Sequence, residues 1–456
     1  MIAVAVQGLF EKSDSIGYDA VFQYIQLLDI VGGDNVRIFS ERYDQERYSD
    51  IKIYPISELI QSDLADTATI IYHYCDGWQE FDEFIAKRRG RTIVRWHNNT
   101  PPWFYASHNL RLAERCVKGF ESIIDLIRIP NIEFWVNSKF TARQLDALSG
   151  GGTVSSVVFP ASRYLDIRSE RRISHVRDGS IRLLFVSRVV AHKGHSHVVE
   201  LAKFIESKLN RKVHVDFAGR HDSSSSAFNK SLRDLCEKSG ASVKFHGEVD
   251  EDRLRELYRN ADAFVCFSEH EGFGLPVFEA MRCGVPVIAW SRTALNELLH
   301  GHPLCFDQFD RASFAAAIEA LDDPAVVDEV VVLQEKLARA YSRKHVRAQL
   351  TAALNGGVAP AFRGVTASRS TAALRERIER RAATLADESI VETAIEYGEN
   401  FVTRHDIEAY RSMLALQTAE PSSATAGPRA ELLHSRFSTI GGEPSDHGII
   451  IPPRDI

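Results

Sequence analysis

The sequence predicts an α/β protein made of two doubly wound domains, each built on a parallel sheet. Short runs rich in β-branched and aromatic residues alternate with helical patterns, in two series along a chain of 456 residues. A charged stretch at 162–180 separates the two series and would serve as a linker. The length exceeds that of one typical domain, and a hydrophobic content of 44% is enough to fill two cores.

The predicted strands are short and apolar, as expected for strands that are buried on both faces of a parallel sheet. The first series is IAVAV (2–6), VRIFS (36–40), TIIYHY (69–74), TIVRWH (92–97), FWVNS (134–138) and SVVFPA (156–161). The second series is RLLFVS (182–187), VHVDFAG (213–219), SVKFHG (242–247), AFVCFS (263–268), VPVIAW (285–290) and PLCF (303–306). Ligands of such folds bind at the carboxyl ends of the strands, so candidate site residues should follow these runs.

Composition predicts a cytoplasmic enzyme and excludes several other classes. A formal net charge of −7 argues against nucleic-acid binding, which needs a basic face. The six cysteines are scattered without a CxxC pair, so they indicate reduced packing residues and not a disulfide framework or a zinc site. The N-terminus starts directly with a strand-like run, which predicts no signal peptide, and no apolar run reaches the ~18 residues of a membrane span.

The most informative segment is EGFGLPVFE, at 271–279. It places Glu271 and Glu279 eight positions apart across a glycine-rich loop that leads into a helix, with Pro276 suited to the first helical position. Backbone N–H groups at a helix start favour a diphosphate, one carboxylate can face a sugar, and the other can accept hydrogen bonds from ribose hydroxyls. The segment therefore predicts a nucleotide-sugar site.

Several segments together resemble a known family. SEHEGFGLPVFEAMRCGVPVIA resembles the signature of retaining GT-B glycosyltransferases, specifically glycosyltransferase family 4, and RLLFVSRVVAHKGHSHVVELAK (182–203) resembles that family's diphosphate-clamping segment. DFAGR (216–220) resembles the strand and glycine that follow it. In the first half, GYDAVFQYIQLL, RIFSERYD, IIYHY and RWHNNTPPWF resemble a bacterial subgroup that makes polysaccharides, several of whose members use GDP-mannose. The resemblance covers roughly residues 1–355.

The resemblance implies the GT-B architecture, in which two Rossmann-like domains face each other across a cleft. The expected division is an acceptor-side domain, a linker, a nucleotide-sugar-binding domain, a helical extension and a flexible tail, at 1–165, 166–180, 181–355, 356–419 and 420–456. The helical extension is predicted from the three- and four-residue apolar spacing at 371–401, and the tail from its Pro, Ser, Gly and Thr content.

The resemblance also implies roles for individual residues. Arg188 would bind two phosphate oxygens and Lys193 would supply a point charge, so that no metal is needed to stabilise the leaving group. Glu271 would position the donor sugar, and His97 would reach across the cleft to the transferred hexose. The expected catalytic residues are Glu271, His97, Arg188 and Lys193. The expected nucleotide-sugar-binding residues are Arg188, Lys193, Gly219, Gly272, Phe273, Gly274, Leu275 and Glu279.

Other polar residues fit simpler interpretations. His192, His195 and His197 cannot all share one helix face and lack an acidic or cysteine partner at ligand spacing, so we expect no metal there. The acidic run at 250–252 precedes a helix, which predicts N-capping. His73 is a weaker candidate for positioning the acceptor, whereas Tyr18 and Asp19 either contact the acceptor or, as is favoured for Asp19, cap the first helix.

One departure from the family pattern lies after the strand VPVIAW. The family often has a glycine pair there, near the pyrophosphate, whereas this chain has Ser291-Arg292-Thr293-Ala294. Backbone contacts to a donor at that position are therefore in doubt.

The predicted reaction is transfer of a hexose from a nucleotide sugar to a hydroxyl acceptor with retention of configuration, without a cofactor. GDP-mannose is the first expectation for the donor and a UDP-hexose the alternative, and the acceptor would be a glycan or a lipid-linked saccharide. The basic and apolar residues at 110–128 could contact the inner membrane, although a solvated helix packed on its own domain is favoured. The extension at 356–419 could pack on the enzyme or recruit a protein partner.

Two other functions remain open on the sequence. The chain could be a non-catalytic subunit that scaffolds a polysaccharide-assembly complex, although the presence of Glu271, Glu279, Arg188 and Lys193 argues against it. An epimerase with a nicotinamide cofactor is disfavoured because no GxGxxG follows the opening strand.

Overall fold

The computed structural model describes most of the chain in two sheet-based units and a set of C-terminal helices. The described residues are 1–10, 14–162, 164–165, 179–222, 225–357, 360, 362, 364, 368–386 and 401–418. Most of the predicted linker (166–178), part of the predicted extension (387–400) and the predicted tail (420–456) lie outside the described residues.

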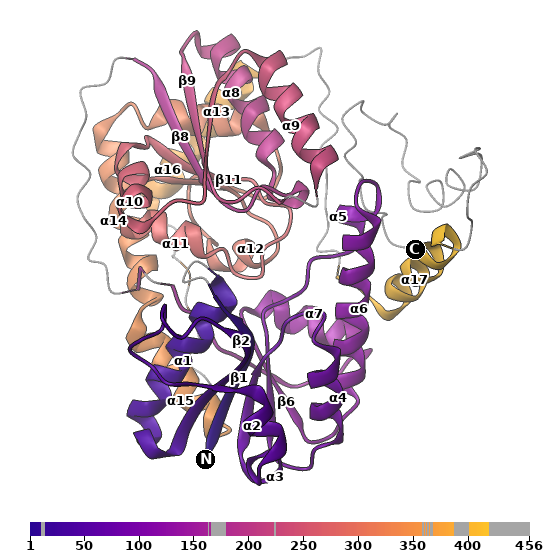
Figure 1. The fold of residues 1–456 in the computed structure, drawn as a ribbon. Coiled ribbons are helices and arrows are strands. Elements are labelled where there is room, and N and C mark those ends of the chain that lie inside the picture. Colours follow the sequence, from indigo (N-terminus) through magenta and orange to yellow (C-terminus); the bar gives the residue numbers. More distant parts are fainter. Residues whose placement is uncertain are drawn as a thin grey trace.

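The first unit is a seven-stranded parallel sheet in the order β3-β2-β1-β4-β5-β6-β7 (Figure 1). Its strands are β1 (Ile2–Leu9), β2 (Val36–Tyr43), β3 (Ile53–Pro55), β4 (Thr69–His73), β5 (Thr92–Trp96), β6 (Ile132–Val136) and β7 (Ser155–Val157). Its helices are α1 (Ser15–Val31), η1 (Gly33–Asn35), α2 (Ile56–Gln61), α3 (Leu64–Thr67), α4 (Gln79–Lys87), α5 (Trp103–Ala106), α6 (Leu110–Ile127) and α7 (Lys139–Ser149). The six predicted runs all overlap strands, although SVVFPA does so only at 156–157, and the short edge strand β3 was not predicted.

The second unit is a six-stranded parallel sheet in the order β10-β9-β8-β11-β12-β13. Its strands are β8 (Ile181–Val186), β9 (Val213–Ala218), β10 (Ser242–Gly247), β11 (Ala263–Cys266), β12 (Val287–Trp290) and β13 (Cys305–Phe306). Its helices are η2 (Ala191–Lys193), α8 (His195–Leu209), α9 (Ser226–Ser239), α10 (Glu251–Asn260), α11 (Leu275–Arg282), α12 (Ala294–Leu298), α13 (Arg311–Ala320) and α14 (Pro324–Ala340). Both sheets have the doubly wound arrangement that the alternation of strand and helix patterns predicts.

Helix starts follow local capping rules, with one correction to the sequence prediction. Asp250 accepts a hydrogen bond from Arg253 N and caps α10, as predicted for the acidic run. The prediction that Asp19 caps the first helix is wrong, because the cap of α1 is Asp14, whose side chain accepts from Gly17 N. Asp19 lies in the second turn of α1 and is fully buried.

The chain crosses between the units more than once. The last helix of the predicted second domain, α15 (Arg343–Leu354), packs on α1 and β7 of the first unit, and Arg91 Nη1 donates to Leu354 O at 2.9 Å. In Figure 1, α15 lies beside α1 and the β1–β7 sheet. The C-terminal part of the chain therefore completes the first unit.

Two further helices form the described part of the C-terminal extension. α16 (Arg369–Leu385) packs along α13 of the second unit, whereas α17 (Arg404–Thr418) packs on α6 and α7 of the first unit (Figure 1). The backbone just before α17 is held by the buried side-chain amide of Gln144 on α7. Gln144 Nε2 donates to Val402 O at 2.7 Å, and Gln144 Oε1 accepts from Val402 N at 2.8 Å. α17 thus covers part of α6, the helix that could have met a membrane. Among the described residues, no helix is both long and apolar enough to cross a membrane.

We expect Gln144→Ala to loosen α17, because Val402 N–H and C=O would both lose their buried partner, at roughly 1–3 kcal/mol for each group. Limited proteolysis with mass spectrometry should show faster cleavage near 401–418, and the melting temperature should fall. Arg411→Ala is the control, since it removes only an exposed ion pair with Glu121, worth about 0–1 kcal/mol. Equal protection of 401–418 in the Gln144 variant and the unmodified chain would contradict the expectation.

Candidate active site

Lys193 and Glu271 form the centre of the candidate site. Lys193 ends η2, just after β8, and Glu271 lies in the loop after β11. Lys193 Nζ lies 2.6 Å from Glu271 Oε1, and the two side chains are only 17% and 14% exposed. Strands β8 and β11 are neighbours in the sheet, so their carboxyl ends bring together a cation and a carboxylate that are 78 residues apart in the sequence.

The loop that carries Glu271 is held in close contact with the first unit. A Cβ atom on Gly272 would lie 2.8 Å from His97 O, so a larger residue would push the two units apart. Gly274 has φ +89° and is the N-cap of α11, which makes Pro276 the second and not the first helical residue. Phe273 is 3% exposed and packs against Phe159, so only its backbone is available to a ligand.

Arg188 and Gly219 lie at the carboxyl ends of β8 and β9. Arg188 is exposed, so its guanidinium is accessible to a phosphate. Gly219 has φ +143°, and a Cβ there would lie 1.9 Å from Ser187 O. The close approach of two strand ends therefore requires a glycine here. The sequence alone could not distinguish this structural requirement from contact with a ligand.

Glu279 is buried on α11 and already has polar partners. Its Oε1 accepts from Ser162 Oγ at 2.7 Å, and Tyr258 OH lies 3.5 Å from its Oε2. Ser162 belongs to the segment by which the chain leaves the first unit. A ligand hydroxyl that binds Glu279 would therefore meet a carboxylate whose orientation is set by this interdomain segment.

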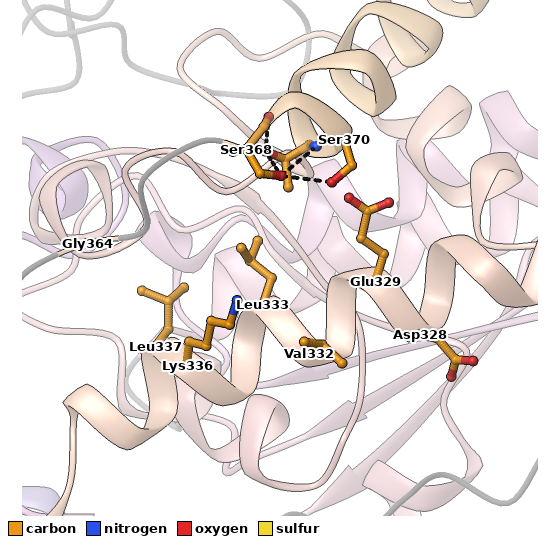
Figure 2. Close-up of a pocket in the computed structure, with 10 residues that line it drawn as sticks. Asp328, Glu329, Val332, Leu333, Lys336, Leu337, Gly364, Ser368 and Ser370 are labelled. Carbon is orange, nitrogen blue, oxygen red and sulfur yellow. Dashed lines mark hydrogen bonds between the residues drawn. The ribbon is translucent and has the colours of Figure 1, made fainter.

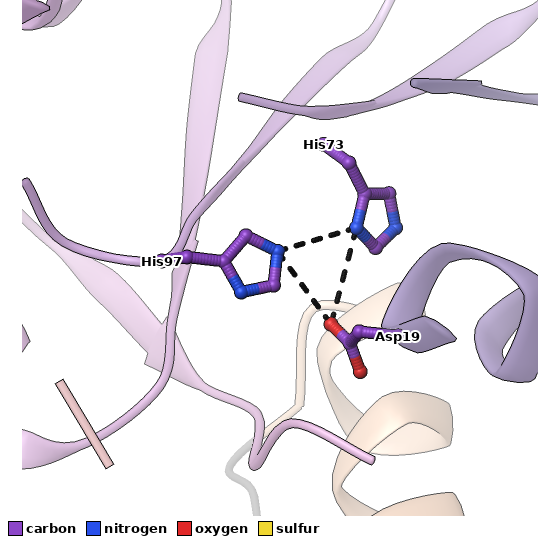
Figure 3. Close-up of side chains that lie close together, drawn as sticks. All are labelled: Asp19, His73 and His97. Carbon is purple, nitrogen blue, oxygen red and sulfur yellow. Dashed lines mark hydrogen bonds and ion pairs between the residues drawn. The ribbon is translucent and has the colours of Figure 1, made fainter. Parts of the chain in front are cut away.

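His97 lies in a buried polar cluster with His73 and Asp19 (Figure 3). His73 Nδ1 lies 3.3 Å from His97 Nε2, and Asp19 Oδ2 lies 3.9 Å from the former and 3.7 Å from the latter. Burial, with the nearby charge of Arg95 adding to it, holds the pKa of both histidines well below the ordinary value. Both rings are therefore neutral near pH 7, and the Nε2 atom of His97 points into the cluster.

The same three residues could in principle hold a metal ion, since two neutral imidazoles and a carboxylate are common ligands. However, Asp19 Oδ2 already accepts from Arg95 Nε and Gln23 Nε2, each at 3.0 Å, and Asp19 Oδ1 accepts from Ala161 N at 2.8 Å. A divalent cation would have to displace these donors beside a buried guanidinium. The donor set favours an ion-paired positioning network over a metal centre.

The two units touch through aromatic and histidine side chains that sequence reasoning did not assign to the site. Tyr105 OH lies 3.4 Å from His192 Nδ1, and the ring of His270 lies 6.2 Å from Phe104 and 5.9 Å from Phe140. Burial lowers the pKa of His270 to about 3. Because these histidines are neutral, they pack between the units as polar aromatic residues.

The remaining histidines of the α8 segment have separate structural surroundings. His195 packs between Phe185 and Phe217, at 4.9 and 4.8 Å, and burial lowers its pKa to about 3. His197 lies 4.5 Å from Phe309, and burial lowers its pKa to about 4. Both histidines are therefore buried among aromatic side chains of the second unit.

Glu269 is a titratable residue close to the candidate site that the sequence analysis did not consider. It lies two positions before Glu271, and its backbone N–H donates to His192 O at 2.8 Å. Burial raises the pKa of its carboxyl to about 7, although Arg292 opposes the shift. The signal available in the sequence was only its place at the end of a buried strand.

A cavity of about 750 Å³ lies elsewhere, between α14 and the start of α16 (Figure 2). Figure 2 shows Glu329 and Leu333 of α14 facing Ser368 and Ser370. None of the predicted site residues lines it. The candidate active site therefore rests on the strand ends and not on this cavity.

Comparison with known proteins identifies the second unit by sequence. Residues 166–329 match the family model described as Glycosyl transferases group 1. A D-inositol 3-phosphate glycosyltransferase of Geodermatophilus obscurus is 29% identical over 227 residues, which is 46% of this chain and 48% of the relative. The O-antigen chain mannosyltransferase B of Escherichia coli is 40% identical over 82 residues, 18% of this chain and 22% of the relative. The matched stretches thus span less than half of these curated relatives.

Comparison of structures identifies the fold of the whole arrangement. Sucrose-phosphate synthase from Thermosynechococcus elongatus superposes with a TM-score of 0.59 at 17% identity, over 78% of this chain and 98% of that one. HepE of Anabaena, solved with UDP-glucose, gives 0.58 at 16% identity, over 78% and 99%. The chain has the GT-B fold, and its residues 166–329 are similar to group 1 glycosyl transferases.

We expect the raised pKa of Glu269 to make stability depend on pH. The folded chain binds this proton more tightly than the unfolded chain, so between the ordinary value of 4.5 and about 7 stability falls as pH rises. Relative to Glu269→Gln, which cannot titrate, the unmodified chain should lose up to about 3 kcal/mol across this window.

Urea unfolding at several pH values measures the difference. Asp82, whose pKa burial raises to about 6, is present in both proteins and cancels. Parallel stability profiles for the two proteins would show that Glu269 keeps an ordinary pKa.

Proposed function

We propose that this chain is a glycosyltransferase that moves a hexose from a nucleotide sugar to a hydroxyl acceptor during polysaccharide or glycolipid assembly. The observation that carries the proposal is the Lys193–Glu271 pair at the carboxyl ends of β8 and β11, within the segment that matches group 1 glycosyl transferases. A cation and a carboxylate at that place suit a sugar diphosphate, in which negative charge develops on the leaving phosphate.

The roles of the residues follow from their placement. Lys193, held by Glu271, and the exposed Arg188 would neutralise the leaving diphosphate. The Glu271 carboxylate has a second oxygen, Oε2, that can accept a hydrogen bond from a sugar hydroxyl. Glu279, oriented by Ser162, would accept from the ribose. These groups belong to the second unit, and we expect the acceptor to enter from the side of the first unit, where His97 lies.

Retention of configuration belongs to this proposal as well. The reaction would proceed by attack on the same face from which the diphosphate leaves, with a leaving phosphate oxygen accepting the proton of the acceptor hydroxyl. His97 is neutral and its Nε2 is engaged with His73, so it would contribute a hydrogen bond to the hexose through its remaining edge and would not act as a general acid at neutral pH.

GDP-mannose is the proposed donor, and a UDP-hexose is the alternative. The short match to an O-antigen chain mannosyltransferase supports mannose, whereas the fold neighbour HepE was solved with UDP-glucose. The acceptor would be a glycan or a lipid-linked saccharide, and the enzyme would act in the cytoplasm, without a metal ion. A scaffold role is the second candidate, supported by the docking of α16 and α17 on different units.

The donor can be identified by thermal unfolding with GDP, UDP, ADP and GDP-mannose in metal-free buffer. A ligand at 100 times its Kd stabilises the native state by ~2.7 kcal/mol, which raises the melting temperature measurably. We expect GDP and GDP-mannose to do so selectively. Stabilisation by UDP alone would favour a UDP-hexose over GDP-mannose as the donor. An unchanged melting temperature with all four ligands would favour the scaffold role.

We expect Lys193→Ala to lower turnover by on the order of 10²–10³-fold, because a preorganised cation at the leaving group is lost. The melting temperature should fall by only a few degrees. The assay is release of nucleoside diphosphate from the donor, and Lys203→Ala, an exposed lysine on α8, is the matched control. A Lys193 variant as fast as the Lys203 variant would remove Lys193 from the site.

A further inference from the structure

Thr293 has a backbone conformation that is unfavourable for its side chain. Its φ is +51° and its ψ is −124°, the values of the first central position of a type II′ turn, where glycine is strongly preferred. Leu295 N donates to Arg292 O at 2.9 Å, which closes that turn. A β-branched residue here is a true outlier, and such strain persists only where the surroundings fix it.

The surroundings that fix Thr293 are the main-chain groups of Glu271. Thr293 Oγ1 accepts from Glu271 N at 2.9 Å and donates to Glu271 O at 3.0 Å. Ala294 N also donates to Glu271 O, at 3.3 Å. One hydroxyl therefore pairs with both the backbone N–H and the backbone C=O of Glu271, whose carboxylate holds Lys193.

The contact is rigid on both sides. Thr293 is 8% exposed, and the Leu295 side chain packs so closely on Gly274 that a Cβ there would lie 2.6 Å from Leu295 Cδ2. Further along α12, Glu297 Oε1 accepts from Lys139 N of the first unit at 2.7 Å. The α12 start thus links the Glu271 loop to the opposite unit.

We propose that Thr293 is a positioning residue whose hydroxyl fixes the Glu271 loop in the geometry of the Lys193–Glu271 pair. The expected effect on the reaction rests on the proposed function. The hydrogen bonds between Thr293 and Glu271 do not depend on it. We call the two hydrogen bonds from the Thr293 hydroxyl to the Glu271 backbone the clamp. The same side chain causes both the strain and the clamp, because glycine at this position would relax the turn and remove the hydroxyl. The strained backbone of Thr293 lowers stability, but its hydroxyl holds the charged Glu271 in place, a combination that is common at functional sites.

Three substitutions separate the clamp from the strain. Thr293→Ser keeps the hydroxyl, Thr293→Ala keeps the strain without it, and Thr293→Gly removes both. We expect Thr293→Gly to unfold at a higher temperature than Thr293→Ala, because both variants lose the hydroxyl and only glycine relieves the strain. It should nevertheless lose turnover by about tenfold or more, through kcat, because a misplaced catalytic group slows the chemical step. Thr293→Ser should stay within about threefold of the unmodified rate, by the same reasoning.

A second readout makes the test independent of activity. Amide hydrogen exchange in 269–274 should accelerate in Thr293→Gly and Thr293→Ala but not in Thr293→Ser, because the Glu271 amide loses its acceptor. If exchange accelerates in these two variants while the unmodified chain transfers no sugar, the role of the Thr293 hydroxyl is supported and the proposed function is rejected. Unchanged exchange together with unchanged kcat in Thr293→Gly would overturn the clamp.

Discussion

The structure depends on how one short buried segment, 158–162, crosses from the first unit toward the second. Buried polar groups must be hydrogen-bonded, and here the partners are four side chains from three distant parts of the chain. Gln349 accepts from Phe159 N, Tyr341 OH donates to Pro160 O, Asp19 accepts from Ala161 N, and Glu279 accepts from Ser162 Oγ. Two of these partners, Asp19 and Glu279, also belong to the two halves of the candidate site. The geometry of that site is therefore tied to the crossing between the units.

The two units meet mainly through neutral polar aromatic groups. His192 and His270 of the second unit lie against Tyr105, Phe104 and Phe140 of the first, and burial keeps their pKa low. Neutral imidazoles can be buried at far lower cost than charged ones, and they still offer hydrogen bonds. The charged pairs near this contact include Arg95 with Asp19 within the first unit, Lys193 with Glu271 within the second, and Arg143 with Glu297 between the units.

Backbone strain is found beside these pairs. Apart from glycines, positive φ angles among the described residues occur at Asn98, Asn210 and Thr293. Asn98 follows His97, and Thr293 holds the backbone of Glu271, whereas Asn210 ends helix α8. Asparagine tolerates this region, but threonine does not, so Thr293 is the position at which structure and local preference disagree. Such disagreement is expected where the geometry of a site outweighs local stability.

The sequence by itself determined the two parallel sheets, their strands apart from β3, and the loop that carries Glu271, because alternating β-branched runs and helix caps act over a few neighbouring residues. It also predicted that Lys193 and Glu271 each follow a strand, whereas the adjacency of these two strands came from the structure. Only the tertiary structure decided that Asp19 forms a buried ion pair, that Gly219 is needed for strand approach, that α17 returns to the first unit, and that Thr293 clamps Glu271. Each of these depends on contacts between residues far apart in the chain, which local patterns do not encode.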